Sequence, residues 1–380
     1  MKHVHLQAFV VMLLGACGAA AMAQSTAKAW GRIDVGIVSL DNGQSRLTDI
    51  DSGEFLVSRV GFKGSEDLGG GNAAHFYLET GFLPDTGSAI AGSRIWNRGA
   101  YVGLSSKDWG RLQIGRMFVP IFYVFNGSDE GGAQRTAAYG TVSALQRTHL
   151  FRINAAALGQ AVSASVSSNA LVSASGGTAS ANFTSAFANN QVQYMSPSFN
   201  GLSFMLSAAP GENNADGGKL RGANVQYQQQ GVYLGAAWNR IEGASLGGAP
   251  QRTTEAAIDA NYTVLSSVEF WANVHRWSVN TGLAEVSGHG YALGAIYTGG
   301  PHSLWADYGR KALSACAACG SSAWSVGYYY ALSRRTQLYS FYAKVTNQAN
   351  AATVLGSNNT PPSSYGAGVR GIGAGVVHVF

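Results

Sequence analysis

Apolar and polar residues alternate with a period of two in one segment after another of this chain, and helical spacing is not sustained anywhere beyond the first 23 residues. In 202–209, Leu, Phe, Leu and Ala fall on one face and two serines on the other. The same alternation occurs in 231–239, 268–275 and 337–345. A two-residue period is that of a β-strand whose two faces meet different surroundings. The pattern therefore predicts an all-β fold.

The strand-like segments number sixteen. Their approximate cores are 30–40, 54–63, 73–83, 95–105, 109–117, 190–197, 201–209, 221–229, 231–240, 252–264, 267–278, 288–299, 301–310, 322–333, 335–346 and 365–380. Short connections such as 106–108, 198–200 and 265–266 alternate with long ones. The long ones are 41–53, 84–94, 118–189, 210–220, 241–251, 311–321 and 347–364. An up-and-down barrel in a membrane has tight turns on one rim and loops on the other.

The composition suits a closed barrel in a bilayer. Charged residues make up 12% of the chain, about half the usual share, while Gly is present 50 times. A mean hydropathy of +0.02 is too polar for a bundle of membrane helices. A sandwich would not keep its loop lengths alternating, and a β-helix would show a fixed short repeat. In hydrocarbon every backbone group needs a partner, so we predict a closed sixteen-stranded antiparallel transmembrane β-barrel.

The N-terminus has the features of a secretory signal. Lys2 is followed by an uncharged apolar run, and Ala21-Met22-Ala23 forms a small-x-small cleavage pattern. We predict that residues 1–23 are a signal peptide and that 24–380 form the barrel. A membrane anchor, or lipoprotein processing at Cys17, are the alternatives.

Two cysteines remain after the signal, Cys316 and Cys319. In an exported chain this spacing is compatible with a small disulfide or with two free thiols. A zinc site would need further ligands, and a redox motif would need a βαβ unit. We expect no metal and no cofactor.

The connection 118–189 is much longer than the others. Its first half carries Phe118, Ile121, Phe122 and Phe125, followed by an acidic, glycine-containing tip, and its second half is rich in Ser, Ala, Gly and Asn. A loop of this length in a compact protein is usually functional. Apolar anchors followed by an acidic tip suit a loop that packs inside the barrel.

Several segments together resemble the general porins of Gram-negative bacteria, in particular the trimeric β-proteobacterial type. Residues 58–71, SRVGFKGSEDLGGG, are similar to the second strand and first periplasmic turn of that family. NRGAYVGL at 97–104, QYMSP at 193–197, LSRRTQLY at 332–339 and the terminal Phe380 follow in the family's order. The long insert at about 150–188 departs from the family pattern.

The resemblance implies a passive diffusion channel in the outer membrane, a homotrimer, and a third outer loop that folds into the lumen. It also implies a row of basic residues on the wall facing acidic residues of that loop. On this resemblance the pore constriction consists of Arg32, Arg59, Arg98, Arg116, Asp129 and Glu130. Gly366, Gly368 and Gly373 near the closing strand would permit close contact between barrels.

The physics of the strands supports part of this assignment. Arg59 and Lys63 share one face of the strand 54–63, opposite Val60 and Phe62. A lipid-facing Arg near the midplane costs about 2–4 kcal/mol, so the basic face must be the lumen. Arg116 shares a face with apolar residues instead, and only a bulge at Gly115 would turn it inward.

We predict that the channel serves small hydrophilic solutes and ions, with a weak preference for anions because the basic row exceeds the two acids. A sugar- or anion-specific channel is the alternative, and an outer-membrane barrel enzyme is a remote one. No His-Glu-x-x-His motif is present, and a Gly-x-Ser-x-Gly pattern at 243–247 lies in a connection between two strand segments, not at the strand-to-helix turn that a nucleophile elbow needs. We predict no enzyme activity. We interpret Trp96, Trp238, Trp271, Trp305 and Trp324 as interfacial girdles rather than as a sugar slide.

Overall fold

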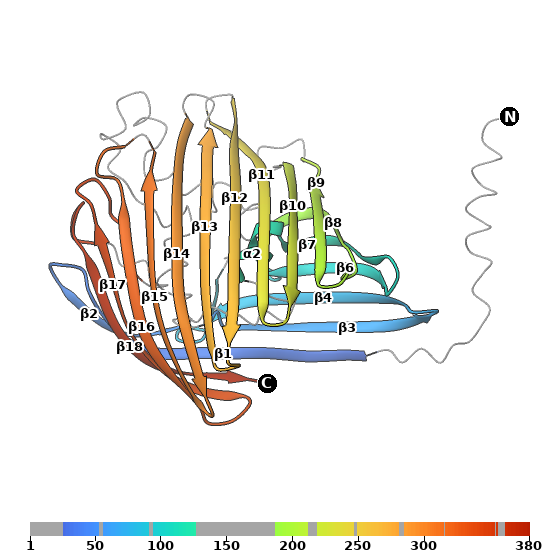
Figure 1. Cartoon of the computed structure of the whole chain (residues 1–380), viewed down its shortest axis with the longest axis horizontal. Coiled ribbons are helices and arrows are strands. Elements are labelled where there is room, and N and C mark those ends of the chain that lie inside the picture. The colour runs from blue at the N-terminus through green and yellow to red at the C-terminus, as the bar shows by residue number, and fades with distance from the viewer. Residues whose placement is uncertain are drawn as a thin grey trace.

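The computed structural model describes residues 26–380 except 53–55, 91–93, 127–186, 212–218, 247–248, 281–284, 315, 354 and 356–361. These residues form one antiparallel sheet and a short helix, α2 (Pro120–Asn126) (Figure 1). The strands are β1 (Thr26–Asp41), β2 (Arg46–Ser52), β3 (Arg59–Gly69), β4 (Asn72–Leu83), β5 (Ser88–Ala89), β6 (Gly99–Ser106), β7 (Gly110–Phe118), β8 (Phe187–Met195), β9 (Leu202–Ala209), β10 (Lys219–Gln229), β11 (Val232–Leu246), β12 (Ala249–Val264), β13 (Val268–Asn280), β14 (Glu285–Gly299), β15 (His302–Leu313), β16 (Ser321–Ala331), β17 (Thr336–Asn347) and β18 (Val369–Val379). The predicted signal segment 1–23 lies outside the described residues and stays a prediction.

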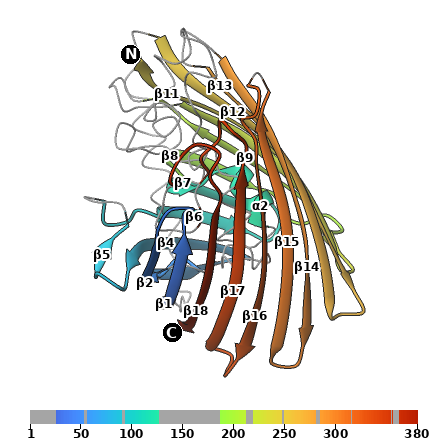
Figure 2. The same ribbon diagram turned by 90° about the vertical axis from the view of Figure 1, so that its left-hand side faces the viewer.

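The sheet closes into a barrel of sixteen strands. Each strand pairs with the next, and β1 pairs with β18, so the first and last strands meet (Figure 1, Figure 2). β2 pairs with residues 35–41 of β1 and β3 with residues 26–32, so β2 and β3 together occupy one position in the ring. β5 pairs with β4 alone and stands outside the ring. The predicted strand number is therefore confirmed.

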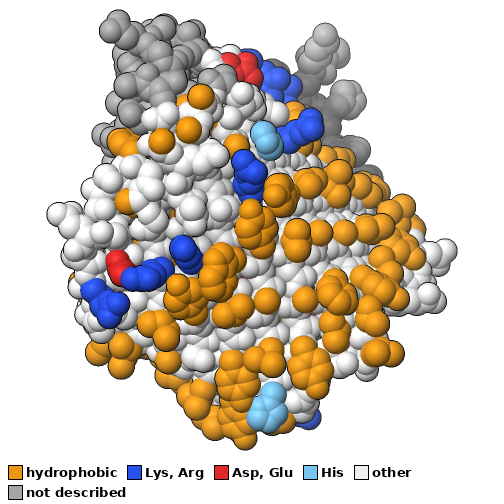
Figure 3. Space-filling view, turned by 60° about the vertical axis from the view of Figure 1, so that its left-hand side comes forward, with side chains coloured by type: hydrophobic (Ala, Val, Ile, Leu, Met, Phe, Trp, Pro, Cys, Tyr) orange, Lys and Arg blue, Asp and Glu red, His pale blue; other side chains and the backbone are white. Residues whose placement is uncertain are grey.

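Side chains alternate between the lumen and the outside along every barrel strand. On β12, Glu255, Asp259 and Asn261 are at most 4% exposed, whereas Ile258 and Tyr262 are more than 50% exposed. Figure 3 shows the outward apolar side chains in rows across one face of the barrel. A polar inner face and an apolar outer face are what a barrel filled with water and surrounded by lipid requires. Among the described residues, no helix is long and apolar enough to cross a membrane.

Two of the five predicted girdle tryptophans face the wrong way for that role. Trp238 and Trp324 point outward and are 41% and 39% exposed, but Trp271 and Trp305 are buried on the inner face, at 5% and 6%. Trp271 is two residues from Asn273 and therefore shares its face. Tryptophan is common at the membrane–water interface, but the position of each tryptophan in the alternation along its strand decides whether its ring points inward or outward.

Glycines on neighbouring strands make room for these inner rings. A Cβ on Gly294 would overlap the indole of Trp271, and one on Gly327 would overlap the indole of Trp305. Both rings belong to an apolar cluster on the inner wall together with Ile296, Tyr339 and Val377. The high glycine content thus serves the packing of large side chains inside a narrow barrel.

Tight turns join the strands at one rim. The turn between β10 and β11 has positive φ angles at Gln230 (52°) and Gly231 (80°), and that between β12 and β13 at Leu265 (52°) and Ser266 (56°). Two consecutive residues with positive φ match the right-handed twist of the flanking strands. These turns lie on the rim opposite the long loops, as predicted.

Replacement of Gly327 tests the packing of Trp305. Gly327→Ala should lower the free energy of unfolding by about 1–3 kcal/mol, because the new methyl group forces the indole off the wall. Denaturant titration of the detergent-solubilised barrel measures this. In a Trp305→Ala background the same glycine substitution should cost little, because the obstructing ring is gone. An equal loss of unfolding free energy in both backgrounds would show that Gly327 is not needed for the packing of the Trp305 ring.

Candidate functional site

The long loop turns into the barrel where it begins. β7 ends at Phe118 and β8 begins at Phe187, so the loop is 119–186, slightly shorter than predicted, because Phe118 and Phe187 still pair across the two strands. Val119, Ile121 and Val124 are at most 1% exposed. They pack against inward-facing residues of β9 to β12, namely Ala209, Leu220, Ala237, Ile241 and Ala257. Helix α2 therefore lies on the inner wall.

Hydrogen bonds and a glycine hold α2 against that wall. The Asn224 side-chain amide donates to the Pro120 carbonyl at 2.8 Å, and the Tyr233 hydroxyl donates to the Val124 carbonyl at 3.3 Å. A Cβ on Gly222 would lie only 3.0 Å from the Pro120 ring. The first turn of the loop is thus docked by residues on strands that lie about one hundred positions later in the chain.

Arg32 and Arg59 face each other across β1 and β3 on the inner wall. They are direct partners in the antiparallel register and are 8% and 3% exposed. The guanidinium of Arg59 lies 5.6 Å from the centre of the Trp30 ring. Direct partners in an antiparallel pair lie close together on one face, and like charges there repel each other unless an anion compensates them.

Glu79 on β4 supplies an anion for Arg59 and for Arg98. One of its carboxylate oxygens lies 3.3 Å from Nη1 of Arg59 and also accepts a hydrogen bond from Nε of Arg98. The other oxygen accepts a hydrogen bond from the hydroxyl of Tyr77. Glu79 is 1% exposed, so one buried carboxylate links two predicted constriction arginines.

A bulge redirects Arg116. The register of β7 against β8 shifts between Gly115 and Met117, and Gly115 has a φ of 141°. Arg116 then donates from Nε to the Asn97 carbonyl at 2.8 Å and from Nη1 to the Asn189 side-chain oxygen at 2.6 Å. The bulge that the alternation required at Gly115 is therefore present.

The ring of Phe187 connects Arg116 with the other arginines. Its centre lies 5.2 Å from the Arg116 guanidinium and 5.3 Å from that of Arg98. Phe187 in turn stacks on Phe118 at the base of the long loop. Arg32, Arg59, Arg98 and Arg116 thus form one continuous group, which we call the arginine row. Asp129 and Glu130 lie outside the described residues.

Acidic residues on the facing wall were not predicted. Glu255 and Asp259 on β12, Glu269 on β13 and Asp307 on β15 share the inner face of their strands. The ring order places β12 and β13 close to half a turn from β1, β3 and β4, and β15 between a quarter and half a turn from them. Glu255 lies 3.6 Å from Nε2 of His275, and Asp307 accepts hydrogen bonds from Ser325 at 2.8 Å. The inner wall thus carries four arginines on one side, with Asp34 and Glu79 among them, and these four acids on the other, with Lys311 beside Asp307. This unequal distribution gives the lumen a transverse field.

These acids could have been found by the same argument that found Arg59. Glu79 shares its face with His75 and Tyr77, and Glu255 shares its face with Asp259. A charged residue opposite apolar ones must face the lumen. The contact between Glu79 and the two arginines could not be predicted in this way, because it depends on the register between strands and not on the face of one strand. In the described part of the chain, no group of three or more His, Cys, Asp and Glu side chains could hold a metal ion.

The outer mouth is narrowed by the connection that follows β17. Leu355 is 2% exposed and packs with Val38, Leu40, Val345 and Val369 on the inner wall. Thr353 anchors this segment, because its backbone N–H donates to the Asn347 side-chain oxygen at 2.9 Å and its carbonyl accepts from the Asn347 amide at 3.1 Å. The inward position of Thr353 and Leu355 was not predicted.

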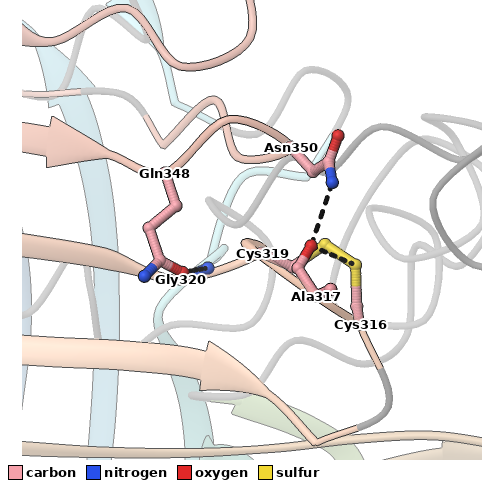
Figure 4. The surroundings of a disulfide bond; sticks show 6 residues. All are labelled: Cys316, Ala317, Cys319, Gly320, Gln348 and Asn350. Carbon is pink, nitrogen blue, oxygen red and sulfur yellow. Dashed lines mark hydrogen bonds between the residues drawn. A yellow bond between two sulfur atoms is a disulfide. The ribbon is translucent and has the colours of Figure 1, made fainter.

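A disulfide between Cys316 and Cys319 shapes the neighbouring loop (Figure 4). The Asn350 side chain donates to the Ala317 carbonyl within this short ring at 2.9 Å. Gly320 N–H donates to the Gln348 side chain at 2.7 Å. The disulfide loop therefore holds Gln348 and Asn350, which begin the connection after β17, through hydrogen bonds.

Comparison with known proteins places these features in a family context. The sequence model of Gram-negative porins matches residues 8–350. Outer membrane porin protein 32 of Delftia acidovorans is 26% identical, over 98% of this chain and 99% of that protein. The structure of an anion-selective porin from Comamonas acidovorans superposes with a TM-score of 0.74 and 20% identity, covering 94% of this chain and 100% of that one. The trimer form of OmpT from Vibrio cholerae superposes with a TM-score of 0.65 and 13% identity, covering 94% of this chain and 99% of that one.

Neutralising Glu79 should destabilise the barrel. Glu79→Gln leaves the guanidinium groups of Arg59 and Arg98 buried without their anion, which should cost about 3–5 kcal/mol. Glu242→Gln is the matched control, because Glu242 also contacts two arginines, Arg240 at 3.4 Å and Arg252 at 3.6 Å, but on the exposed outer face. Its loss should cost less than about 1 kcal/mol. Denaturant midpoints compare the two, and equal losses would contradict the role given to burial.

Proposed function

The chain belongs to the Gram-negative porin family, and from this premise we propose that its pore favours small anions over cations. The protein is a β-barrel of the outer membrane and a passive diffusion channel, not an enzyme. The observation that carries the proposed selectivity is the arginine row. Four guanidinium groups line one side of the lumen, and one carboxylate, Glu79, contacts two of them.

The local excess of positive charge matters more than the net charge of the chain. Salt screens charges beyond about 8–10 Å, so an ion in the narrow part responds to the groups nearest to it. Charges in a low-dielectric wall act strongly over that short distance. The acids of β12 to β15 lie across the ring and reduce the preference without removing it. We therefore propose a weak to moderate preference, with the loop 118–189 narrowing the pore and Asp129 and Glu130 facing the arginine row.

The relatives support this direction. The Comamonas protein is described as anion-selective, and its fold covers most of this chain. A sugar-specific channel would need aromatic rings open to the lumen. Trp271, Trp277 and Trp305 face inward, but they are only 3–6% exposed. These three rings pack into the wall, where they cannot stack on a passing sugar, which favours a general pore over a sugar slide. A charge at the same depth still acts on a passing ion, because the electrostatic field needs no contact.

Bilayer recordings test the selectivity. The protein should conduct in steps without added energy, and the reversal potential across a salt gradient should indicate a preference for anions. Arg59→Ser with Arg116→Ser should shift this potential toward cation selectivity, since two charges leave the arginine row.

The matched control is Arg334→Ser with Arg335→Ser, which removes two exposed arginines from a turn at the rim. It should leave the potential nearly unchanged. If the Arg59 and Arg116 variant conducts with the parent's reversal potential, these arginines do not line the constriction.

We also propose that the barrel assembles as a homotrimer. Gly373 cannot contribute as the sequence suggested, because it faces inward and a Cβ there would lie 2.6 Å from the Phe341 ring. The outward surface beside the closing strands is apolar instead. Ile37 on β1 and Ile50 on β2 are direct partners and are 61% and 57% exposed.

Native mass measurement tests the assembly. Ile37→Asn with Ile50→Asn should convert trimers to monomers, because polar amides disrupt an apolar contact between barrels. Leu234→Asn with Ile258→Asn makes the same change on β11 and β12, where the residues are 50% and 57% exposed, and should leave trimers intact. Only monomers for the parent protein would refute the homotrimer.

A further inference from the structure

Aromatic side chains form a continuous series on the inner wall beside the arginine row. The ring centre of Trp30 on β1 lies 5.6 Å from that of Tyr77 on β4, and Tyr77 lies 5.2 Å from Tyr101 on β6. The ring of His75, also on β4, meets Tyr101 edge-on at 6.3 Å. We call these four residues the aromatic ladder. All four side chains are partly exposed, unlike the buried tryptophan rings on β13 and β15.

Strand register brings these rings together. Tyr77 and Tyr101 are direct partners across β4 and β6, and their rings stack with an angle of 16° between their planes. The partner of Trp30 on the intervening strand β3 is Gly61, where a Cβ would lie 3.1 Å from the indole nitrogen of Trp30. The missing side chain at Gly61 therefore leaves room for the indole beside the tyrosines.

The aromatic ladder lies between the arginine row and the turn rim. Trp30 is two residues from Arg32 on one face of β1, and Tyr77 is two residues from Glu79 on one face of β4. The turn 70–71 joins β3 to β4, and the beginning of β1 pairs with the part of β3 that leads to this turn. Trp30 and Tyr77 are thus nearer the turn rim than their charged neighbours. A solute that has passed the arginine row meets these rings next.

Cations border the aromatic ladder. Nζ of Lys63 lies 5.3 Å from the centre of the Trp30 ring, and the guanidinium of Arg59 lies 5.6 Å from it. Lys63 is exposed and forms no ion pair with any residue that the structure describes. Nε and Nη2 of Arg32 have no hydrogen-bond acceptor among the same residues. An anion beside these rings therefore finds positive charges that no carboxylate of the described chain has taken.

We propose that the aromatic ladder binds small aromatic carboxylates, the class to which benzoate belongs. This inference rests on the proposed preference for anions and names the anions that the pore would hold longest. The ring of such a solute can stack on the partly exposed rings or meet them edge-on, while its carboxylate accepts hydrogen bonds from Lys63 or Arg32. A neutral sugar gains nothing from the cations, and chloride gains nothing from the rings. An aromatic carboxylate uses both.

Transient block of the chloride current through single channels in a planar bilayer measures this binding. The parent should bind benzoate about fivefold more strongly than cyclohexanecarboxylate, which has the same charge but no π-system, since an aromatic pair is worth about 1 kcal/mol beyond the area it buries. Benzamide has the ring without the charge. It should bind about fivefold more weakly than benzoate, since a hydrogen bond to a charged group is worth about 1 kcal/mol more than a neutral one.

Variants locate the site. Tyr101→Leu should abolish the preference for benzoate over cyclohexanecarboxylate, and Tyr101→Phe should preserve it because the ring remains. Tyr77 stays in place, because its hydroxyl donates to Glu79. Tyr329→Leu is the matched control, since Tyr329 is a partly exposed ring of the inner wall on β16 that packs against Trp305 at 5.3 Å. This control should keep the preference of the parent.

Equal binding of benzoate and cyclohexanecarboxylate by the parent overturns the proposal, and so does equal binding of benzoate and benzamide. These two comparisons need no variant, so they decide the proposal even where a substitution prevents folding. A folded Tyr101→Leu variant that keeps the preference, or a Tyr329→Leu control that loses it, also overturns the proposed site. The reversal potential in potassium chloride tests the proposed function separately. A chloride-selective parent that binds both carboxylates equally refutes the aromatic site alone, whereas a parent without anion preference refutes the proposed selectivity.

Discussion

The requirement that every backbone N–H and C=O be hydrogen-bonded inside a lipid bilayer determines the rest of this structure. A sheet meets it only by closing, and the pairing of β1 with β18 over ten consecutive residues provides the closure. A closed sheet has one inner and one outer face, so each strand must place alternate residues in water and in lipid. The alternation in the sequence is the direct consequence of this geometry.

The inner face then has to accommodate charges in a confined space. The arginine row is stable because Glu79 contacts two of its members and because aromatic rings, Trp30 and Phe187, lie against the guanidinium groups. This arrangement holds the cations in place without cancelling them, which is what a selective pore needs. Helix α2 occupies the wall between the arginine row and the facing acids, and thus narrows the path between them.

The outer face meets a different solvent at each depth. Apolar side chains cover the middle, aromatic rings follow, and basic residues stand at the loop rim. Near this rim, Leu355 packs back onto the inner wall of the barrel. The inner face of the barrel thus serves conduction, and the outer face serves contact with lipid.

The sequence by itself determined the strand number, the faces of the strands, the alternation of turns and loops, and the inward direction of Arg59. All of these depend on a period of two residues, which is local and readable. Tertiary structure alone decided which side chains meet: the contact of Glu79 with two arginines, the bulge that brings Arg116 to Asn97 and Asn189, the inward rings of Trp271 and Trp305 against glycines, and the docking of α2 on β10 and β11. These contacts depend on the register between strands that are distant in sequence. A shift of that register by two residues leaves the alternation of both strands unchanged, so the alternation cannot reveal it.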